Sequence, residues 1–191
     1  MIPNAQFYDK AYRSSWNGLT VISISIGQGE VTLTPLQIAN LCATIANRGT
    51  YVTPHVVKNV EGDTLASTYL APRTTLASRK AYESVVAGMR QAVLAGTCRG
   101  ANLPNIEVCG KTGTAQNKGK DHSAFIGFAP MDKPQIALAV YVENGGFGAT
   151  YAVPIGALIM EQYLTGTLSE TSKIKAAEMQ NRVIYYGESE R

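Results

Sequence analysis

Residues 109–117 read Cys-Gly-Lys-Thr-Gly-Thr-Ala-Gln-Asn, and this run opens the part of the chain that decides the fold. The segment 108–114 is the first of three predicted strands, and 123–129 and 136–142 are the other two, because each is short, largely apolar and bounded by turn residues. Residues 130–134, Pro-Met-Asp-Lys-Pro, suit a hairpin connection between the last two strands. This order predicts an antiparallel meander.

Helices are predicted before and after the meander. Thr34 followed by Pro35 is typical of an N-cap and a first helical residue, Ser78 is a second N-cap, and Gly166 is a typical helix end. The predicted helices cover residues 36–47, 78–95 and 152–164. Together with the strands they indicate an α+β fold in which helices cover an antiparallel sheet.

The remaining segments carry weaker patterns. Residues 1–18 are predicted to be a loop, because proline, asparagine and glycine interrupt them. Residues 19–26 are rich in Val, Ile and Ser and predict a short strand, and 51–60 look extended. Residues 167–191 are polar and charged with weak helical periodicity, which predicts a tail.

The composition is that of a globular protein that can bury a core. Hydrophobic residues make up 45% and charged residues 16% of the 191 residues. The formal net charge of +3 is scattered, without the basic stripe that favours nucleic acid. The apolar runs 136–142 and 152–160 are too short to span a membrane, and the first residues do not resemble a signal peptide. We therefore expect no nucleic-acid partner and no membrane anchor within this chain.

The cysteines and histidines do not predict a metal site. Cys42, Cys98 and Cys109 form no Cys-x-x-Cys pair and have no ligand spacing with His55 or His122. We interpret all three cysteines as small buried hydrophobic side chains.

Lys111-Thr112-Gly113 is the Lys-Thr-Gly element of penicillin-binding proteins and serine β-lactamases. Further short runs follow the chain order of class B penicillin-binding proteins: Gly-Gln-Gly at 27–29, Thr-Pro-Leu-Gln-Ile-Ala at 34–39, Ala-Asn-Arg-Gly at 46–49, Gly-Thr-Cys at 96–98 and Phe-Ile-Gly-Phe-Ala-Pro at 125–130. This ordered set over residues 19–165 resembles the C-terminal part of their transpeptidase domain. His122 and the Val-Glu-Asn-Gly-Gly run at 142–146 resemble the elongation-type group, penicillin-binding protein 2.

The resemblance implies a substrate strand in the penicillin-binding and serine β-lactamase-like transpeptidase fold. Lys111 would fix the substrate's terminal carboxylate through its ammonium group, and the threonine hydroxyls of Thr112 and Thr114 would add hydrogen bonds. Gly113 has no side chain and would let the substrate lie against the strand. The backbone N–H of Thr114 would be one donor of an oxyanion hole. Lys111 and Thr114 are thus the candidate catalytic residues, and residues 111–114 the candidate substrate-binding set.

The implied reaction is acyl transfer by a serine-type D,D-transpeptidase, with no metal or organic cofactor. A serine attacks the penultimate D-alanine carbonyl of a peptidoglycan stem peptide, releases the last D-alanine and passes the acyl group to a neighbouring amine. The implied partners are stem peptides ending in D-Ala-D-Ala, the β-lactam antibiotics that imitate them, and the cell-wall elongation machinery. The implied location of the parent protein is the periplasmic face of the inner membrane.

The serine nucleophile is not identified in this chain. The family needs Ser-x-x-Lys and Ser-x-Asn before Lys-Thr-Gly, but residues 172–175 match the first pattern after the motif, and residues 15–17 match the second too close to 27–29. We interpret both matches as coincidental. Residues 1–166 are thus predicted to be the C-terminal portion of one transpeptidase domain, with 167–191 a polar tail. The chain alone is predicted to be inactive.

Two alternatives from other classes compete with this interpretation. Residues 105–112 are one residue short of the P-loop pattern of nucleotide-binding proteins, with Asn105 where the first glycine belongs. A P-loop lysine must open a helix, however, and Gly113 with the run 117–120 opposes a helix there. The other alternative is a non-catalytic module that only binds the substrate. His122, near the start of a predicted strand, is interpreted as a structural residue, with a catalytic role as the less favoured alternative.

Overall fold

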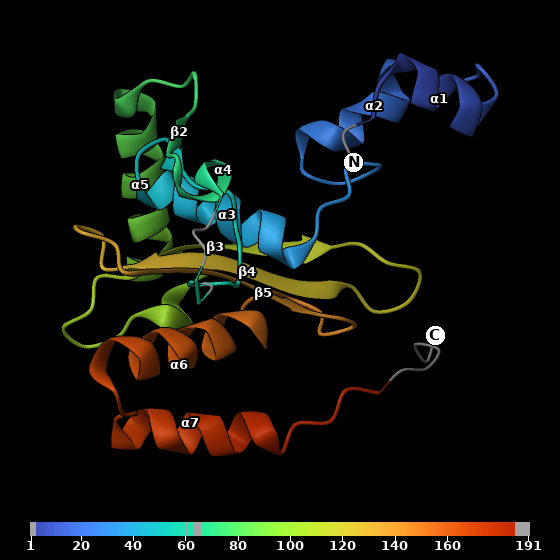
Figure 1. The fold of residues 1–191 in the computed structure, drawn as a ribbon. Coiled ribbons are helices and arrows are strands. Elements are labelled where there is room, and N and C mark those ends of the chain that lie inside the picture. Colours follow the sequence, from blue (N-terminus) through green and yellow to red (C-terminus); the bar gives the residue numbers. More distant parts are fainter. Residues whose placement is uncertain (1–2, 60, 63–65, 186–191) are drawn as a thin grey trace. The chain divides into compact units, whose positions relative to one another are not determined.

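The computed structural model describes residues 3–59, 61–62 and 66–185, and it divides into two compact units, one ending at Thr34 and one beginning at Pro35. The second unit is built on a three-stranded antiparallel sheet in the order β3-β4-β5 (Figure 1). The strands are β3 (Cys109–Ala115), β4 (His122–Ala129) and β5 (Ile136–Val142). The predicted meander is confirmed, and each strand end lies within one residue of its predicted position.

Helices cover both faces of this sheet. On one face lie α3 (Pro35–Ala46) and α5 (Arg79–Leu94), and on the other lies α6 (Ala152–Thr165) with α7 (Glu170–Gln180) packed against it (Figure 1). The three predicted helices and the α+β class are confirmed. The smaller elements are β1 (Thr50–Tyr51), α4 (Ser67–Leu70), β2 (Arg73–Thr74) and the 3-10 helix η1 (Arg99–Ala101). Of the described residues in the predicted extended segment 51–60, Tyr51 alone lies in a strand.

The register decides which side chains face which helices. Lys111 lies opposite Ile126, and Thr112 lies opposite Phe125. Directly paired residues of an antiparallel sheet share a face, and successive residues alternate between faces. Lys111 and Ile126 therefore face α3 and α5, whereas Thr112 and Phe125 face α6.

The ring of Phe125 fills a space that three glycines leave open. A Cβ atom would lie 2.5 Å from this ring at Gly110 of β3, 2.7 Å at Gly127 of β4, and 2.6 Å at Gly156 of α6. Phe125 is 1% exposed and belongs to the core cluster that joins the sheet to α6. Because the close approach comes from three elements, the ring holds β3 and α6 in fixed positions on β4.

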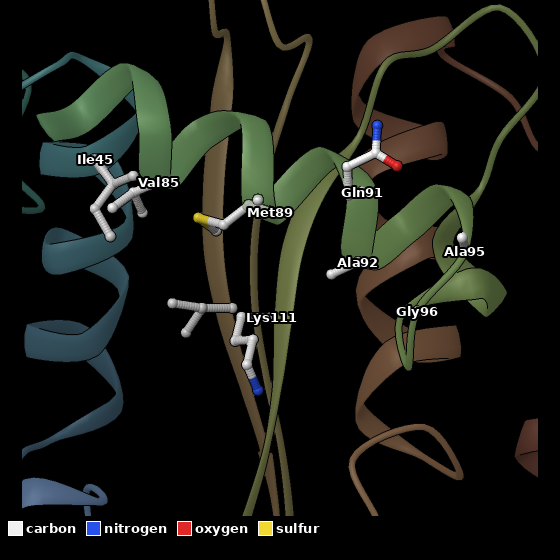
Figure 2. Close-up of a pocket in the computed structure, with 10 residues that line it drawn as sticks. Ile45, Val85, Met89, Gln91, Ala92, Ala95, Gly96 and Lys111 are labelled. Carbon is white, nitrogen blue, oxygen red and sulfur yellow. The ribbon is translucent and has the colours of Figure 1, made fainter. Parts of the chain in front are cut away.

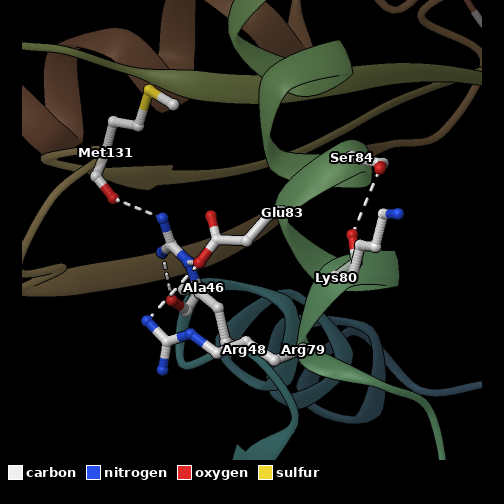
Figure 3. Close-up of polar contacts among 7 residues, drawn as sticks. All are labelled: Ala46, Arg48, Arg79, Lys80, Glu83, Ser84 and Met131. Atoms are coloured by element: carbon white, nitrogen blue, oxygen red, sulfur yellow. Dashed lines mark hydrogen bonds and ion pairs between the residues drawn. The ribbon is translucent and has the colours of Figure 1, made fainter.

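On the other face of the sheet, Arg48, which follows the end of α3, connects several elements. Arg48 donates to the carbonyl of Ala46 at 2.6 Å and to that of Met131, in the turn between β4 and β5, at 3.2 Å (Figure 3). Its Nε lies 3.4 Å from the carboxylate of Glu83 on α5, which Arg79 also approaches (Figure 3). One guanidinium thus links α3, α5 and the sheet.

The first unit corrects two predictions. The predicted loop 1–18 contains α1 (Ala5–Tyr12), with residues 1–2 outside the described part. The predicted strand 19–26 lies almost wholly in α2 (Gly18–Ser25).

Two asparagines explain both corrections. Asn4 accepts a hydrogen bond from the backbone N–H of Phe7 at 2.9 Å, and Asn17 forms a reciprocal capping box with Thr20. The sequence pattern treated these asparagines as chain breakers, but both are helix N-caps. The strand preference of the Val- and Ile-rich segment is overridden by the capping box that precedes it.

The predicted tail 167–191 contains the helix α7, which a buried carboxylate anchors to α6. Glu161 on α6 accepts a hydrogen bond from the backbone N–H of Ser169, the N-cap of α7, at 3.0 Å. Burial raises the pKa of the Glu161 carboxyl, but hydrogen bonds from Ser172 and Ser169 and the charge of Lys175 together hold that pKa below its ordinary value of 4.5. The ionised carboxylate therefore stabilises the folded state.

We predict that Glu161→Gln lowers the free energy of unfolding at pH 7 by about 1 kcal/mol, because the neutral amide loses charge-assisted hydrogen bonds at a helix N-terminus. The folded-state pKa is depressed, so the stabilisation is present above pH 4.5 and is lost as the pH falls through the folded value. Urea unfolding of both proteins from pH 7 to pH 3 checks this. A difference between them that stays constant over that range would contradict it.

Candidate functional site

The Lys-Thr-Gly residues lie on β3, which pairs with β4 alone among the described strands and is therefore an edge strand. The ammonium of Lys111 donates to the carbonyl of Thr112 at 2.7 Å. This contact indicates that the carbonyl faces the outer edge of the sheet, away from β4. Alternate residues of an antiparallel strand share their backbone orientation, so the N–H of Thr114 faces the same edge.

Lys111 also lines a pocket of about 680 Å³ between α5, α3 and the sheet (Figure 2). The other lining residues are uncharged: Ile45, Val85, Gly88, Met89, Gln91, Ala92, Ala95, Gly96 and Ile126. Figure 2 shows the ammonium end of Lys111 pointing away from α5. A cation beside low-dielectric apolar surface attracts an anion more strongly than a cation surrounded by water. Lys111 is exposed, so its ammonium is accessible to a carboxylate that binds beside the apolar lining.

A second polar pair lies at the same edge. The hydroxyl oxygens of Thr97 and Thr112 are 2.7 Å apart, which is a hydrogen bond between the loop after α5 and the strand β3. Next to Thr97, Cys98 is fully buried. Burial raises the pKa of the Cys98 thiol, which nearby Thr97, Thr112 and Lys111 offset only in part. A neutral thiol therefore underlies the hydroxyl pair.

Gly113 leaves one face of β3 bare. A Cβ atom at Gly113 would meet one side chain, Ala124, at 3.3 Å and nothing else within 4 Å. From the opposite face, the backbone of Gly148 presses on the strand, since a Cβ atom there would lie 2.8 Å from the carbonyl oxygen of Gly113. The strand is thus open to a ligand on one face and supported by backbone on the other.

His122 makes structural contacts. Its Nδ1 accepts a hydrogen bond from the backbone N–H of Asn144 at 3.0 Å, and its ring packs against Tyr141 with centroids 5.3 Å apart. These contacts hold the Glu-Asn-Gly-Gly turn at 143–146 against the start of β4. They account for His122 without a role in the chemistry.

The serine of the Ser-x-x-Lys match lies on the other side of the sheet from α3 and α5, and the residues of the Ser-x-Asn match make structural contacts within the first unit. Ser172 lies on α7 and is 5% exposed, next to Glu161 and on the far side of the sheet from α3 and α5 (Figure 1). The structure therefore does not bring Ser172 and Lys111 together. In the first unit, Asn17 caps α2, and the neighbouring Trp16 donates to Asp9 at 2.7 Å.

The P-loop alternative is not supported by the backbone. Lys111 and Thr112 lie in the middle of β3, whereas a P-loop requires them at the start of a helix.

Within the described ranges, no group of three or more His, Cys, Asp or Glu side chains is placed to hold a metal ion. No helix in the same ranges has the length and apolar character to cross a membrane.

Comparison with known proteins places these features in one family. The family model described as the penicillin binding protein transpeptidase domain matches residues 7–161. A peptidoglycan D,D-transpeptidase named MrdA from Acinetobacter baumannii is 39% identical over 172 residues, covering 80% of this chain and 25% of that protein.

Two solved structures are similar to the fold. A crystal structure of Pseudomonas aeruginosa penicillin-binding protein 2 aligns with a TM-score of 0.75 and 33% identity, covering 89% of this chain and 37% of the other. Penicillin-binding protein A from Mycobacterium tuberculosis, in a penicillin G acyl-enzyme complex, aligns with a TM-score of 0.62 and 31% identity, covering 73% and 34%. The chain thus spans a quarter to little more than a third of the length of these three proteins.

We predict opposite outcomes for two substitutions on β3. Gly110→Ala places a Cβ atom 2.5 Å from the Phe125 ring and lowers the free energy of unfolding by about 1–3 kcal/mol through overpacking. Gly113→Ala places a Cβ atom 3.3 Å from one small side chain, that of Ala124, and changes the free energy of unfolding by less than about 1 kcal/mol. Urea unfolding of the two variants beside the wild type measures both effects. Equal destabilisation by both would contradict the open face at Gly113.

Proposed function

The chain belongs to the penicillin-binding protein transpeptidase family, and on this premise we propose that it supplies the substrate-binding strand of a serine-type D,D-transpeptidase that cross-links peptidoglycan. The observation that carries the proposal is the Lys111 ammonium, which is the one charged group among the described residues lining the pocket beside β3. A transpeptidase must hold the carboxylate that ends its donor peptide while leaving the adjacent amide open to attack. An edge strand with a lysine and a bare glycine meets both needs.

Each residue of the strand has a separate task in the proposed reaction. Lys111 and the hydroxyl of Thr112 bind the terminal carboxylate of the donor peptide, and Gly113 leaves space for its backbone. The Thr114 hydroxyl adds a hydrogen bond to the same carboxylate. When the serine oxygen attacks the penultimate D-alanine carbonyl, the developing oxyanion accepts a hydrogen bond from the Thr114 N–H.

The remaining steps complete the acyl transfer. The tetrahedral intermediate expels the last D-alanine as its free amine and leaves an ester on the serine. The amine of a neighbouring stem peptide then attacks this ester, forms the cross-linking amide and returns the serine hydroxyl. We assign the serine and its base to a part of the protein outside this chain, because Ser172 faces Glu161 on the far side of the sheet.

The proposed ligands and setting follow from the same family. The donor is a stem peptide ending in D-Ala-D-Ala, and β-lactams compete with it by acylating the serine, as the penicillin G complex of the mycobacterial relative supports. His122 and the Glu-Asn-Gly-Gly turn support the elongation type, so we place the parent protein with the cell-wall elongation machinery, at the periplasmic face of the inner membrane. No observation favours nucleotide binding.

We predict that the 191-residue chain alone forms no covalent adduct with a fluorescent penicillin. The reason is that Ser172, the serine of the Ser-x-x-Lys match, lies on α7 beside Glu161, on the other side of the sheet from α3 and α5. Denaturing gel electrophoresis after incubation measures the label, with the longer transpeptidase that contains this chain as the positive control. A stoichiometric label on the short chain would contradict the assignment of the nucleophile.

In the longer transpeptidase, we predict that Lys111→Ala slows acylation by penicillin about a hundredfold, because the carboxylate loses its cationic partner. Thermal unfolding should change little, since Lys111 is an exposed side chain. Lys80→Ala on α5 removes an equal charge from an exposed helix position and serves as the matched control. An unchanged acylation rate for Lys111→Ala would remove this residue from the substrate site.

A further inference from the structure

Thr97 is held in place by the end of the helix before it. The carbonyl of Ala92 accepts hydrogen bonds from the backbone N–H groups of Gly96 at 3.1 Å and Cys98 at 3.0 Å. The turn is close enough that a Cβ atom at Gly96 would lie 2.8 Å from the Cα of Ala92. With the buried Cys98 anchored in the core on its other side, Thr97 has a fixed position relative to β3.

From this position the Thr97 side chain contacts Thr112 on the substrate strand and the buried thiol of Cys98. Its hydroxyl is 2.7 Å from that of Thr112, and the Lys111 ammonium is 2.7 Å from the carbonyl of the same threonine. Thr97 itself is exposed, so the pair is accessible from solvent. The three groups form a continuous polar edge beside the apolar pocket.

The chemistry of a hydroxyl pair gives this contact a direction. Two hydroxyls that hydrogen-bond to each other share one proton, and the second proton is left to donate elsewhere. A hydroxyl that accepts a hydrogen bond becomes a stronger donor through its own proton. A carboxylate is the ligand that gains most from such a donor, because hydrogen bonds to an ionised acceptor are stronger than neutral ones.

We propose that Thr97 is a positioning residue for carboxylate recognition: its hydroxyl donates to the Thr112 oxygen, which turns the Thr112 proton toward the terminal carboxylate held by Lys111. The inference rests on the proposed transpeptidase function and deepens it. Thr97 does not touch the substrate. It restricts the Thr112 hydroxyl to the one rotamer and proton direction that the anion requires.

The test is made in the longer transpeptidase with two ligands that differ only in the carboxylate, a penicillin and its methyl ester. The second-order acylation rate is measured by the loss of later labelling with fluorescent penicillin. Thr97→Val, which replaces the hydroxyl with a methyl group of similar size, is expected to lower the rate with penicillin about five- to tenfold, the loss of one hydrogen bond. The rate with the ester is expected to change less than about twofold, and Thr97→Ser is expected to restore the wild-type rate with both ligands.

Two results would overturn this inference alone. The first is a Thr97→Val rate equal to that of the wild type, and the second is an equal loss with penicillin and with its ester, which would mean a general structural role. Thr97→Ala is measured alongside, so that a folding defect of the valine variant does not decide the outcome. Absence of acylation in the wild type would instead overturn the proposed function, and this inference with it.

Discussion

The second unit of the chain depends on the packing of one ring, that of Phe125, against three glycines. Gly110, Gly127 and Gly156 belong to β3, β4 and α6, and at each a Cβ atom would come closer than 3 Å to this ring. Close packing of this kind leaves no freedom for a strand to slide, because interiors are as dense as organic crystals. The position of β3, and with it that of Lys111 one residue after Gly110, is therefore set by the core.

A fixed core on the α6 face of β3 leaves the opposite face and the outer edge of the strand accessible, and at that edge the Thr112 hydroxyl contacts Thr97. Lys111 and Gly113 lie on the opposite face of the sheet from Phe125, and the pocket lies on that face. There, the absence of a side chain at Gly113 serves no packing purpose, since little lies within reach of a Cβ atom. Glycine thus permits close packing at Gly110, and at Gly113 it provides access under the proposed function. A rigid strand with an accessible face is what a preorganised binding site requires.

Much of this arrangement could be predicted from the sequence, because the strong signals are local. The apolar runs and the turn at 130–134 predicted the meander, and the expected N-caps Thr34 and Ser78 predicted the helix starts. The prediction failed at 1–26, where Asn4 and Asn17 act as N-caps rather than breakers. It also missed α7, although its N-cap, Ser169, is a local signal; the contact of Ser169 with Glu161 of α6 adds to it and is visible only in the fold.

The candidate site likewise has one part that the sequence shows and another part that only the folded chain brings together. Lys111, Thr112, Gly113 and Thr114 are adjacent in sequence, so their motif was visible without a structure. The hydrogen bond between Thr97 and Thr112 joins residues fifteen positions apart, and no local pattern predicts it, although the Gly-Thr-Cys run at 96–98 marked the right segment. The pocket beside Lys111 is likewise formed by α3, α5 and the sheet together.

The central claim is that β3 is a preformed strand for binding a peptide carboxylate. The most direct measurement is a nuclear magnetic resonance titration of the isotope-labelled chain with N-acetyl-D-alanyl-D-alanine, and in parallel with its C-terminal amide. The account predicts that the acid shifts the backbone amides of residues 111–114 and Thr97, that the amide shifts them far less, and that α7 is unaffected. Shifts of equal size with both peptides, or shifts centred on α6 and α7, would contradict it.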